Sequence, residues 1–195
     1  FCSISPIVSA LYSNDIILLV MELYGMFVSH KANKTRDSNI ERTLKFLSIV
    51  LAKSNKKISK ILLENEELEV GIFGICMEMI YSTESARSFA NMTSCLSILA
   101  NIIEHNPMTK IIEELEGNEH LFVVVEVMGE SEDLCSSFLV YTKCLVTYSE
   151  AITDMFIQGE LFSAILPIIH ERITNEQSSW NVKIFVDLIF DLIAA

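Results

Sequence analysis

The histidines are the first candidates for metal or acid–base chemistry, and their spacing supports neither. They are His30, His105, His120 and His170. None has a second ligand at the H-x-x-x-H spacing of a helical metal site. Two of them follow a glutamate directly, but successive residues on a helix point to different sides. We therefore expect no metal site and no cofactor.

Phosphate-binding and nucleophilic motifs are missing as well. Gly71 and Gly74 lie within an apolar stretch that lacks the following Lys of a phosphate-binding loop. No G-x-S-x-G motif occurs. With 26 acidic residues, a pair of carboxylates picked from the sequence identifies no general acid or base. The sequence favours a protein that is not an enzyme, and the helical regulatory part of an enzyme is a lesser alternative.

Composition bounds the class of protein. The 195 residues correspond to one domain, 1–195, and the 51% hydrophobic content with only nine Gly and Pro excludes a disordered or fibrous chain. A net charge of −12 argues against nucleic-acid binding. Residue 1 is Phe rather than Met, so we expect a fragment of a longer protein.

The charge is also unevenly distributed along the chain. Residues 31–60 hold nine basic and two acidic side chains, whereas residues 61–195 hold five basic and 22 acidic ones. Such a chain can steer partners of either sign to different ends, although a solvated surface explains the same pattern.

Cysteine usage and hydropathy bear on location. The number of cysteines is odd, at five, and no C-x-x-C pair occurs, which predicts reduced thiols in a cytoplasmic or nuclear protein. Mean hydropathy is high at +0.41, yet no apolar run reaches the roughly 18–20 residues that span a bilayer. We expect an intracellular protein without membrane insertion.

Apolar residues recur with helical spacing along almost the whole chain. We expect helices at 5–12, 14–30, 39–53, 55–64, 66–81, 85–104, 107–116, 118–129, 132–148, 150–158, 160–173 and 178–194. Ser38 and Glu41 have the spacing of a capping box, Ser131 precedes two acidic residues, and Pro107 fits a first helical turn. The stretch Ala32–Asp37 is expected to be a loop.

Four octapeptides resemble one another and indicate a repeat. They are Thr43–Val50, Cys95–Ile102, Tyr141–Tyr148 and Asn181–Leu188. The first three are followed by a short helical segment, an acidic turn and another apolar helix. Helices in such a repeat bury their apolar faces against neighbouring units. We expect the following residues to be buried: Leu44, Leu47, Leu99, Ile102, Leu145, Phe185 and Leu188.

This order of three helices resembles the armadillo repeat, and the octapeptides resemble the pattern Ala-x-x-x-Leu-x-Asn-Leu of its third helix. The resemblance covers about four units and implies an all-α, right-handed α-solenoid. Asn101 stands at the family's frequent Asn position. The Trp–Asn pairs of nuclear-import adaptors are absent, since Lys45, Ser97, Lys143 and Lys183 occupy the matching Trp positions. A HEAT-like array or an irregular helical bundle remains an alternative.

The resemblance implies that the third and seventh octapeptide positions face a concave groove. Those proposed for partner binding are Lys45, Ser97, Asn101, Lys143, Thr147, Lys183 and Asp187, with Ile49 completing the set. We expect this groove to bind an extended or helical segment of a partner protein. The lysines favour an acidic segment or a carboxyl terminus.

The last helix has a narrow polar stripe and an otherwise apolar circumference. Val186, Phe190 and Ile193 form an apolar strip that one neighbouring unit cannot cover, which predicts a homodimer or a contact with a further unit. Trp180 either staples the entry of this helix or anchors a partner. The sequence thus predicts a protein-binding scaffold or adaptor, with a self-assembly platform as the alternative.

Overall fold

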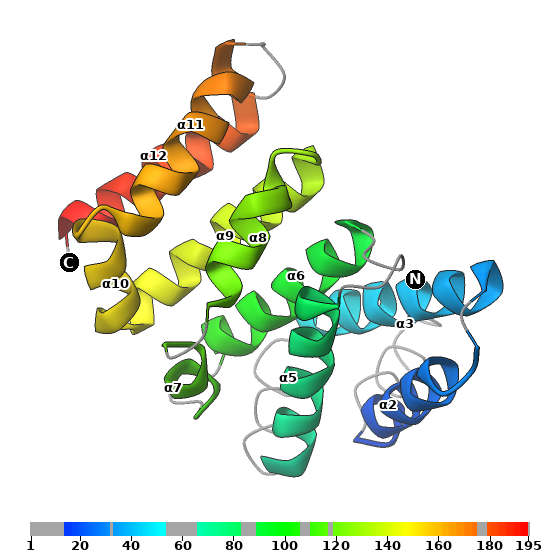
Figure 1. Cartoon of the computed structure of the whole chain (residues 1–195). Helices are drawn as coiled ribbons and strands as arrows, with labels where there is room; N and C mark the ends of the chain where they lie inside the picture. Colours follow the sequence, from blue (N-terminus) through cyan, green and yellow to red (C-terminus); the bar gives the residue numbers. More distant parts are fainter. Residues whose placement is uncertain are drawn as a thin grey trace, which may run out of the picture.

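The computed structural model describes residues 14–31, 33–53, 66–82, 89–105, 110–116, 119–174 and 179–194. Within these ranges all regular structure is helical and no strand occurs, which confirms the expected all-α class (Figure 1). The helices are α2 (Asn14–Val28), α3 (Lys34–Lys53), α5 (Glu66–Tyr81), α6 (Phe89–His105), α7 (Lys110–Glu116), α8 (His120–Met128), α9 (Glu132–Tyr148), α10 (Glu150–Ile157), α11 (Glu160–Thr174) and α12 (Ser179–Ala194).

Two serines define helix starts, one of them predicted. Ser131 caps α9, because its hydroxyl oxygen accepts the Leu134 N–H at 3.3 Å. Ser149 lies between α9 and α10 and caps α10 by accepting the Ile152 N–H at 3.1 Å. Its hydroxyl also donates to Glu116 Oε1 at 2.8 Å, which ties this helix junction to α7. The expected helices 5–12 and 55–64, and Pro107, lie outside the described residues.

The predicted start at Ser38 of the helix expected over 39–53 is wrong. Helix α3 already begins at Lys34, so Ser38 lies inside it and the expected loop over 32–37 is shorter than predicted. Asn33 provides the cap instead, since its Oδ1 accepts the Arg36 N–H at 2.9 Å. Asn33 lies five residues before Ser38 and satisfies one of the free backbone amides of the first turn. Helix α3 therefore begins at Lys34.

The helices pack in two rows. In the first, α3 contacts α6, α6 contacts α9 and α9 contacts α12; these four helices carry the octapeptides, and we call them the octapeptide row. In the second row α2, α5, α8 and α11 contact one another in chain order, and each also packs on the octapeptide-row helix that follows it in the sequence. Figure 1 shows α8 in front of α9 and α11 in front of α12.

The apolar core lies between the two rows and between successive helices of each row. The predicted core is confirmed: every residue expected to be buried is at most 6% exposed. Several methionines also fill the core, among them Met92 and Met128, which are both fully buried. Side chains of all four octapeptide-row helices therefore contribute to one continuous core.

A glycine makes the sharp turn from α10 to α11. Gly159 has φ +86°, in the left-handed region that side chains with a Cβ disfavour. The two helices consequently meet at a bend of 65° rather than continuing as one. This bend lets α11 return over α8 while α10 packs on α9.

Truncation of a core leucine in the octapeptide row should strongly destabilise the fold. Leu99 is fully buried in α6, whose neighbours in the row are α3 and α9. We expect Leu99→Ala to lower the free energy of unfolding by about 2–5 kcal/mol, because lost burial and a residual cavity add. Urea unfolding measures this change.

Leu19→Ala is the matched control, since Leu19 is 48% exposed on α2. It should alter stability by less than about 1 kcal/mol. Equal losses for the two variants would contradict the placement of the core.

Candidate binding face

None of the predicted groove positions is fully buried, and within each helix the third and seventh octapeptide positions lie on the same side. Lys45, Ile49, Thr147 and Lys183 are exposed, and Ser97, Asn101, Lys143 and Asp187 are half-buried. The fifth position of every octapeptide is buried instead, in the order Leu47, Leu99, Leu145 and Phe185. We call the side with the third and seventh positions the open face.

The structure brings part of this set together in a hollow of about 400 Å³. Lys45 and Ile49 of α3 line it together with Ser97 of α6. Further lining comes from Glu41 and Ser48 of α3, Thr93 of α6, and Ser131 and Asp133 at the start of α9. The other predicted groove residues do not line this hollow, although α9 and α12 continue the row beside it.

The hollow is rich in hydrogen-bond acceptors. The hydroxyl of Ser48 donates to the Lys45 carbonyl at 2.9 Å, and that of Thr93 donates to the Phe89 carbonyl at 2.6 Å. Their protons are committed, so their oxygens offer acceptors to a ligand. With the carboxylates of Glu41 and Asp133, the lining suits a ligand that donates hydrogen bonds, such as the amides of an extended peptide.

Two predicted groove residues bond within their own helices. Asn101 Nδ2 donates to the Ser97 carbonyl at 2.6 Å, and Thr147 Oγ1 donates to the Lys143 carbonyl at 2.9 Å. Asn101 thus uses one of its two amide protons internally and keeps its Oδ1 as an acceptor. A ligand amide on this face would be recognised by that oxygen.

One histidine has a buried partner that sequence reasoning missed. His120 Nε2 lies 2.8 Å from the Tyr141 hydroxyl, the rings meet edge-on, and both side chains are fully buried. Burial, as the main cause, raises the pKa of Tyr141 well above its usual value. The neighbouring Glu119 is exposed, as expected for adjacent residues on a helix. The pair satisfies two polar groups that link α8 to α9; no short-range motif connects residues 21 apart.

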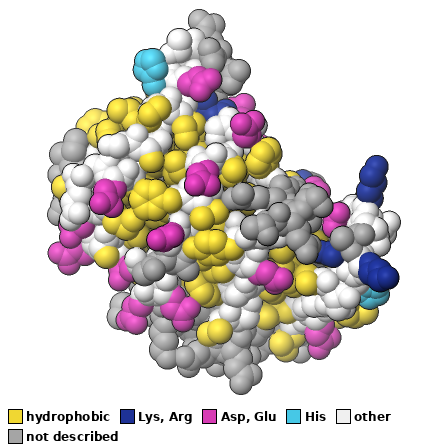
Figure 2. Space-filling model, in the orientation of Figure 1, with side chains coloured by type: hydrophobic (Ala, Val, Ile, Leu, Met, Phe, Trp, Pro, Cys, Tyr) yellow, Lys and Arg dark blue, Asp and Glu magenta, His cyan; other side chains and the backbone are white. Residues whose placement is uncertain are grey.

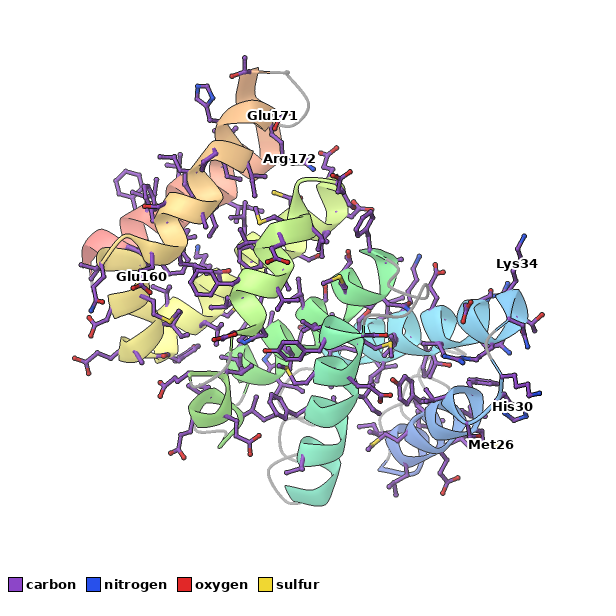
Figure 3. All side chains as sticks on the ribbon, in the orientation of Figure 1. Met26, His30, Lys34, Glu160, Glu171 and Arg172 are labelled. Carbon is purple, nitrogen blue, oxygen red and sulfur yellow. The ribbon has the colours of Figure 1, made fainter. Side chains whose placement is uncertain are left out.

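A buried arginine was also not singled out from the sequence. Arg172 of α11 is only 7% exposed, and its guanidinium donates to the carbonyls of Gly129 at 2.8 Å and Met128 at 3.4 Å. Figure 3 shows its position near the end of α8. The cation satisfies the terminal carbonyls of that helix and opposes the negative end of its dipole.

The described cysteines are free, and the pKa values of three of them are raised. Cys76 and Cys95 are fully buried on α5 and α6, and a hydrogen bond with Cys95 is the main cause that raises the pKa of Cys76, with burial second. Burial raises the pKa of Cys135 and Cys144 to about 11 in each case. The thiols of Cys76, Cys135 and Cys144 are therefore not activated as nucleophiles.

The terminal helix α12 exposes apolar side chains to solvent. Phe185 is buried and stacks on Phe162 of α11 with ring centroids 5.9 Å apart. On the other side of α12, Val186 is 41% and Phe190 65% exposed. Trp180 and Ile193 belong to the same helix, but their side chains lie outside the described part of the structure.

Neither a metal centre nor a lone membrane span is found in the described ranges. No three His, Cys, Asp or Glu side chains there are grouped so as to hold a metal ion. No single helix described is both long and apolar enough to cross a membrane; α10 and Glu160–Arg172 reach that length and composition only as a bent pair.

Comparison with known proteins gives no match: no protein family, curated protein or solved structure corresponds to this chain. The resemblance to armadillo repeats therefore rests on the repeated octapeptides and on the helix order.

The raised thiol pKa values predict slow alkylation. At pH 8 a thiol with a pKa of about 11 is about 0.1% thiolate, against roughly a quarter for an ordinary cysteine. We expect iodoacetamide to modify Cys144 about 100-fold more slowly in the folded chain than in urea. Its rate should rise about tenfold per pH unit from 8 to 10, as the thiol loses its proton.

Peptide mapping by mass spectrometry measures this rate for each cysteine separately. The urea-unfolded chain serves as the control for intrinsic reactivity. Equal rates for Cys144 in the folded and unfolded chain would show that the thiol is not protected as described.

Proposed function

We propose that this chain is an armadillo-like, right-handed α-solenoid that acts as a non-catalytic scaffold and binds a segment of a partner protein along its open face. The observation that carries the proposal is the octapeptide row itself. Four helices with equivalent sequences pack side by side in chain order and place equivalent positions toward solvent. Repeat stacks of this kind form extended binding surfaces.

The chemistry of the open face suits an extended peptide. The hollow between α3, α6 and α9 offers acceptors for main-chain amides, and Asn101 offers a further one on α6. Lys143 and Lys183 stand at the third octapeptide position on α9 and α12. Acidic side chains of the partner would meet these lysines, whereas the hollow would hold its backbone.

Reversing the charge of the two lysines should weaken this complex. We expect Lys143→Glu with Lys183→Glu to raise the dissociation rate of the partner about tenfold, equivalent to about 1.4 kcal/mol, because close ion pairs act mainly on dissociation. The partner is first isolated by affinity capture from the source cell. Its dissociation rate is then measured on immobilised protein.

Lys31→Glu is the matched control, because Lys31 is exposed in the turn between α2 and α3 and does not belong to the open face. It makes the same charge change per site, half of that in the double variant, and should leave dissociation unaltered. Binding that survives both reversals unchanged would remove the open face as the site.

Self-association is the second candidate function, favoured by the exposed strip on α12. Val186 and Phe190 are large apolar residues that no neighbouring helix covers in the described structure. A second copy that meets this strip across a two-fold axis would bury the same residues on both subunits. Such a dimer would leave the open face accessible if the two copies of α12 pair only through the side that carries Val186 and Phe190.

Two charges on the strip should abolish the dimer without unfolding the chain. Val186→Glu with Phe190→Glu places carboxylates on already exposed positions, so we expect a folded monomer where the unmutated chain is a dimer. Light scattering at several concentrations gives the mass, and circular dichroism monitors the fold. A monomeric unmutated chain at high concentration would refute the dimer, and an unfolded variant would place the strip in the core.

A further inference from the structure

A second cavity lies between the end of α2 and the beginning of α3, and nothing in the proposed function uses it. Its volume is about 640 Å³, within the range of small-molecule sites. The lining includes Met26, Phe27, His30, Asn33, Lys34 and Arg36. Figure 3 shows Met26 and His30 near the end of α2 and Lys34 at the start of α3.

The lining combines an apolar surface with basic groups. Met26 is 58% exposed and Phe27 is half-buried, so both present apolar surface to the cavity, as is typical of small-molecule sites. Lys34 and Arg36 add two permanent positive charges. None of the described residues that line the cavity is acidic.

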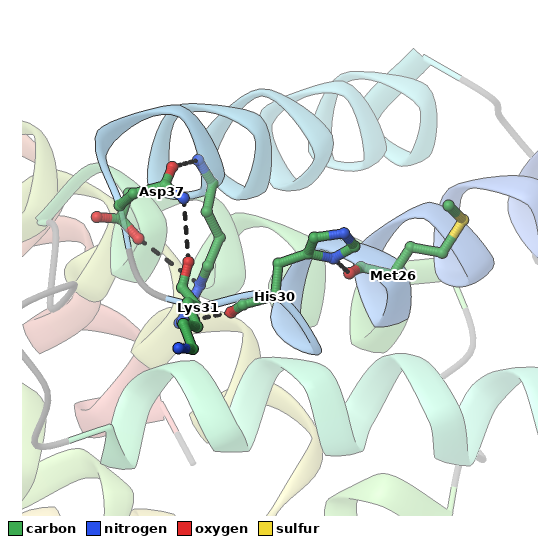
Figure 4. A network of polar contacts seen from close by, with 6 residues as sticks. Met26, His30, Lys31 and Asp37 are labelled. Atoms are coloured by element: carbon green, nitrogen blue, oxygen red, sulfur yellow. Dashed lines mark hydrogen bonds and ion pairs between the residues drawn. The ribbon is translucent and has the colours of Figure 1, made fainter.

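Polar contacts hold Arg36 and His30 in place (Figure 4). A guanidinium N–H of Arg36 donates to the His30 carbonyl at 3.1 Å, and its Nε lies 3.8 Å from Asp37 Oδ1. His30 Nδ1 bonds the Met26 carbonyl at 2.5 Å; since a carbonyl only accepts, Nδ1 carries the proton. Asn33 braces the turn by donating to the Lys31 carbonyl at 3.1 Å.

The long-range field favours the same kind of ligand. The basic residues of the chain are concentrated at 31–60, whereas the rest of this acidic protein is strongly negative. On the face shown in Figure 2, Lys and Arg side chains lie mainly at the α2–α3 end, beside a few acidic ones. In the described structure, Lys31 and residues 33–45 hold five basic and two acidic side chains, so this end would attract an anion.

We propose that this cavity binds a small organic anion in which one negatively charged group is joined to a short apolar chain. The anionic group meets Lys34 and Arg36, and the apolar chain lies on Met26 and Phe27. The inference does not depend on the open face, because the cavity is formed by a separate set of residues.

Octanoate is a suitable probe, because it can be compared with 1-octanol, which has the chain without the charge, and with acetate, which has the charge without the chain. Titrations of the full chain followed by amide NMR shifts give the affinity and the residues involved. We expect octanoate to bind at least tenfold more tightly than either comparison compound. The largest shifts should fall within residues 26–39.

Variants distinguish specific binding of octanoate in the cavity from non-specific adsorption. Lys34→Glu should weaken octanoate binding at least tenfold, and Lys34→Gln should weaken it less. Met26→Gln should weaken octanoate without altering the response to acetate. Lys183→Glu, which makes the same charge change on α12, should have no effect.

Three results would each overturn the proposal. They are equal affinity for octanoate and octanol, unchanged octanoate affinity in a folded Lys34→Glu variant, and shifts centred on helices other than α2 and α3. Circular dichroism of each variant establishes that the fold is retained. Loss of partner binding at the open face would leave these results unaffected, so the two proposals fail separately.

Discussion

Side-by-side packing of α3, α6, α9 and α12 is the constraint on which the rest of this structure depends. Leu47, Leu99, Leu145 and Phe185 occupy the same octapeptide position and are all buried. A helix rises with 3.6 residues per turn, so fixing this position inward fixes the third and seventh positions elsewhere on the circumference. The open face is therefore a geometric consequence of the core.

The second row of helices shields the apolar side of the octapeptide row from water. A layer of four helices would leave one apolar side in water, and α2, α5, α8 and α11 cover it. Two contacts between neighbouring helices, one across the rows and one within the second row, give buried polar groups a partner. His120 pairs with Tyr141, and Arg172 satisfies carbonyls at the end of α8. Leaving such groups without partners would cost about 1–3 kcal/mol each, so these contacts define how neighbouring helices are placed.

The described surface divides into regions of different character. Acceptors gather in the hollow of the open face, basic groups surround the cavity between α2 and α3, and apolar side chains emerge on α12. The hollow and the cavity share α3 but are lined by separate residues of it, and the apolar side chains lie on α12.

The sequence by itself determined the all-helical class, most helix boundaries and the buried positions, because these follow from local periodicity and from caps such as Ser131. It failed at Ser38, where two caps competed and the earlier one, Asn33, prevailed. Tertiary structure alone decided which helices are neighbours and which distant side chains meet. His120 with Tyr141, and the residues of different helices that line the hollow and the cavity, come together through packing between helices, and no spacing along the chain encodes this.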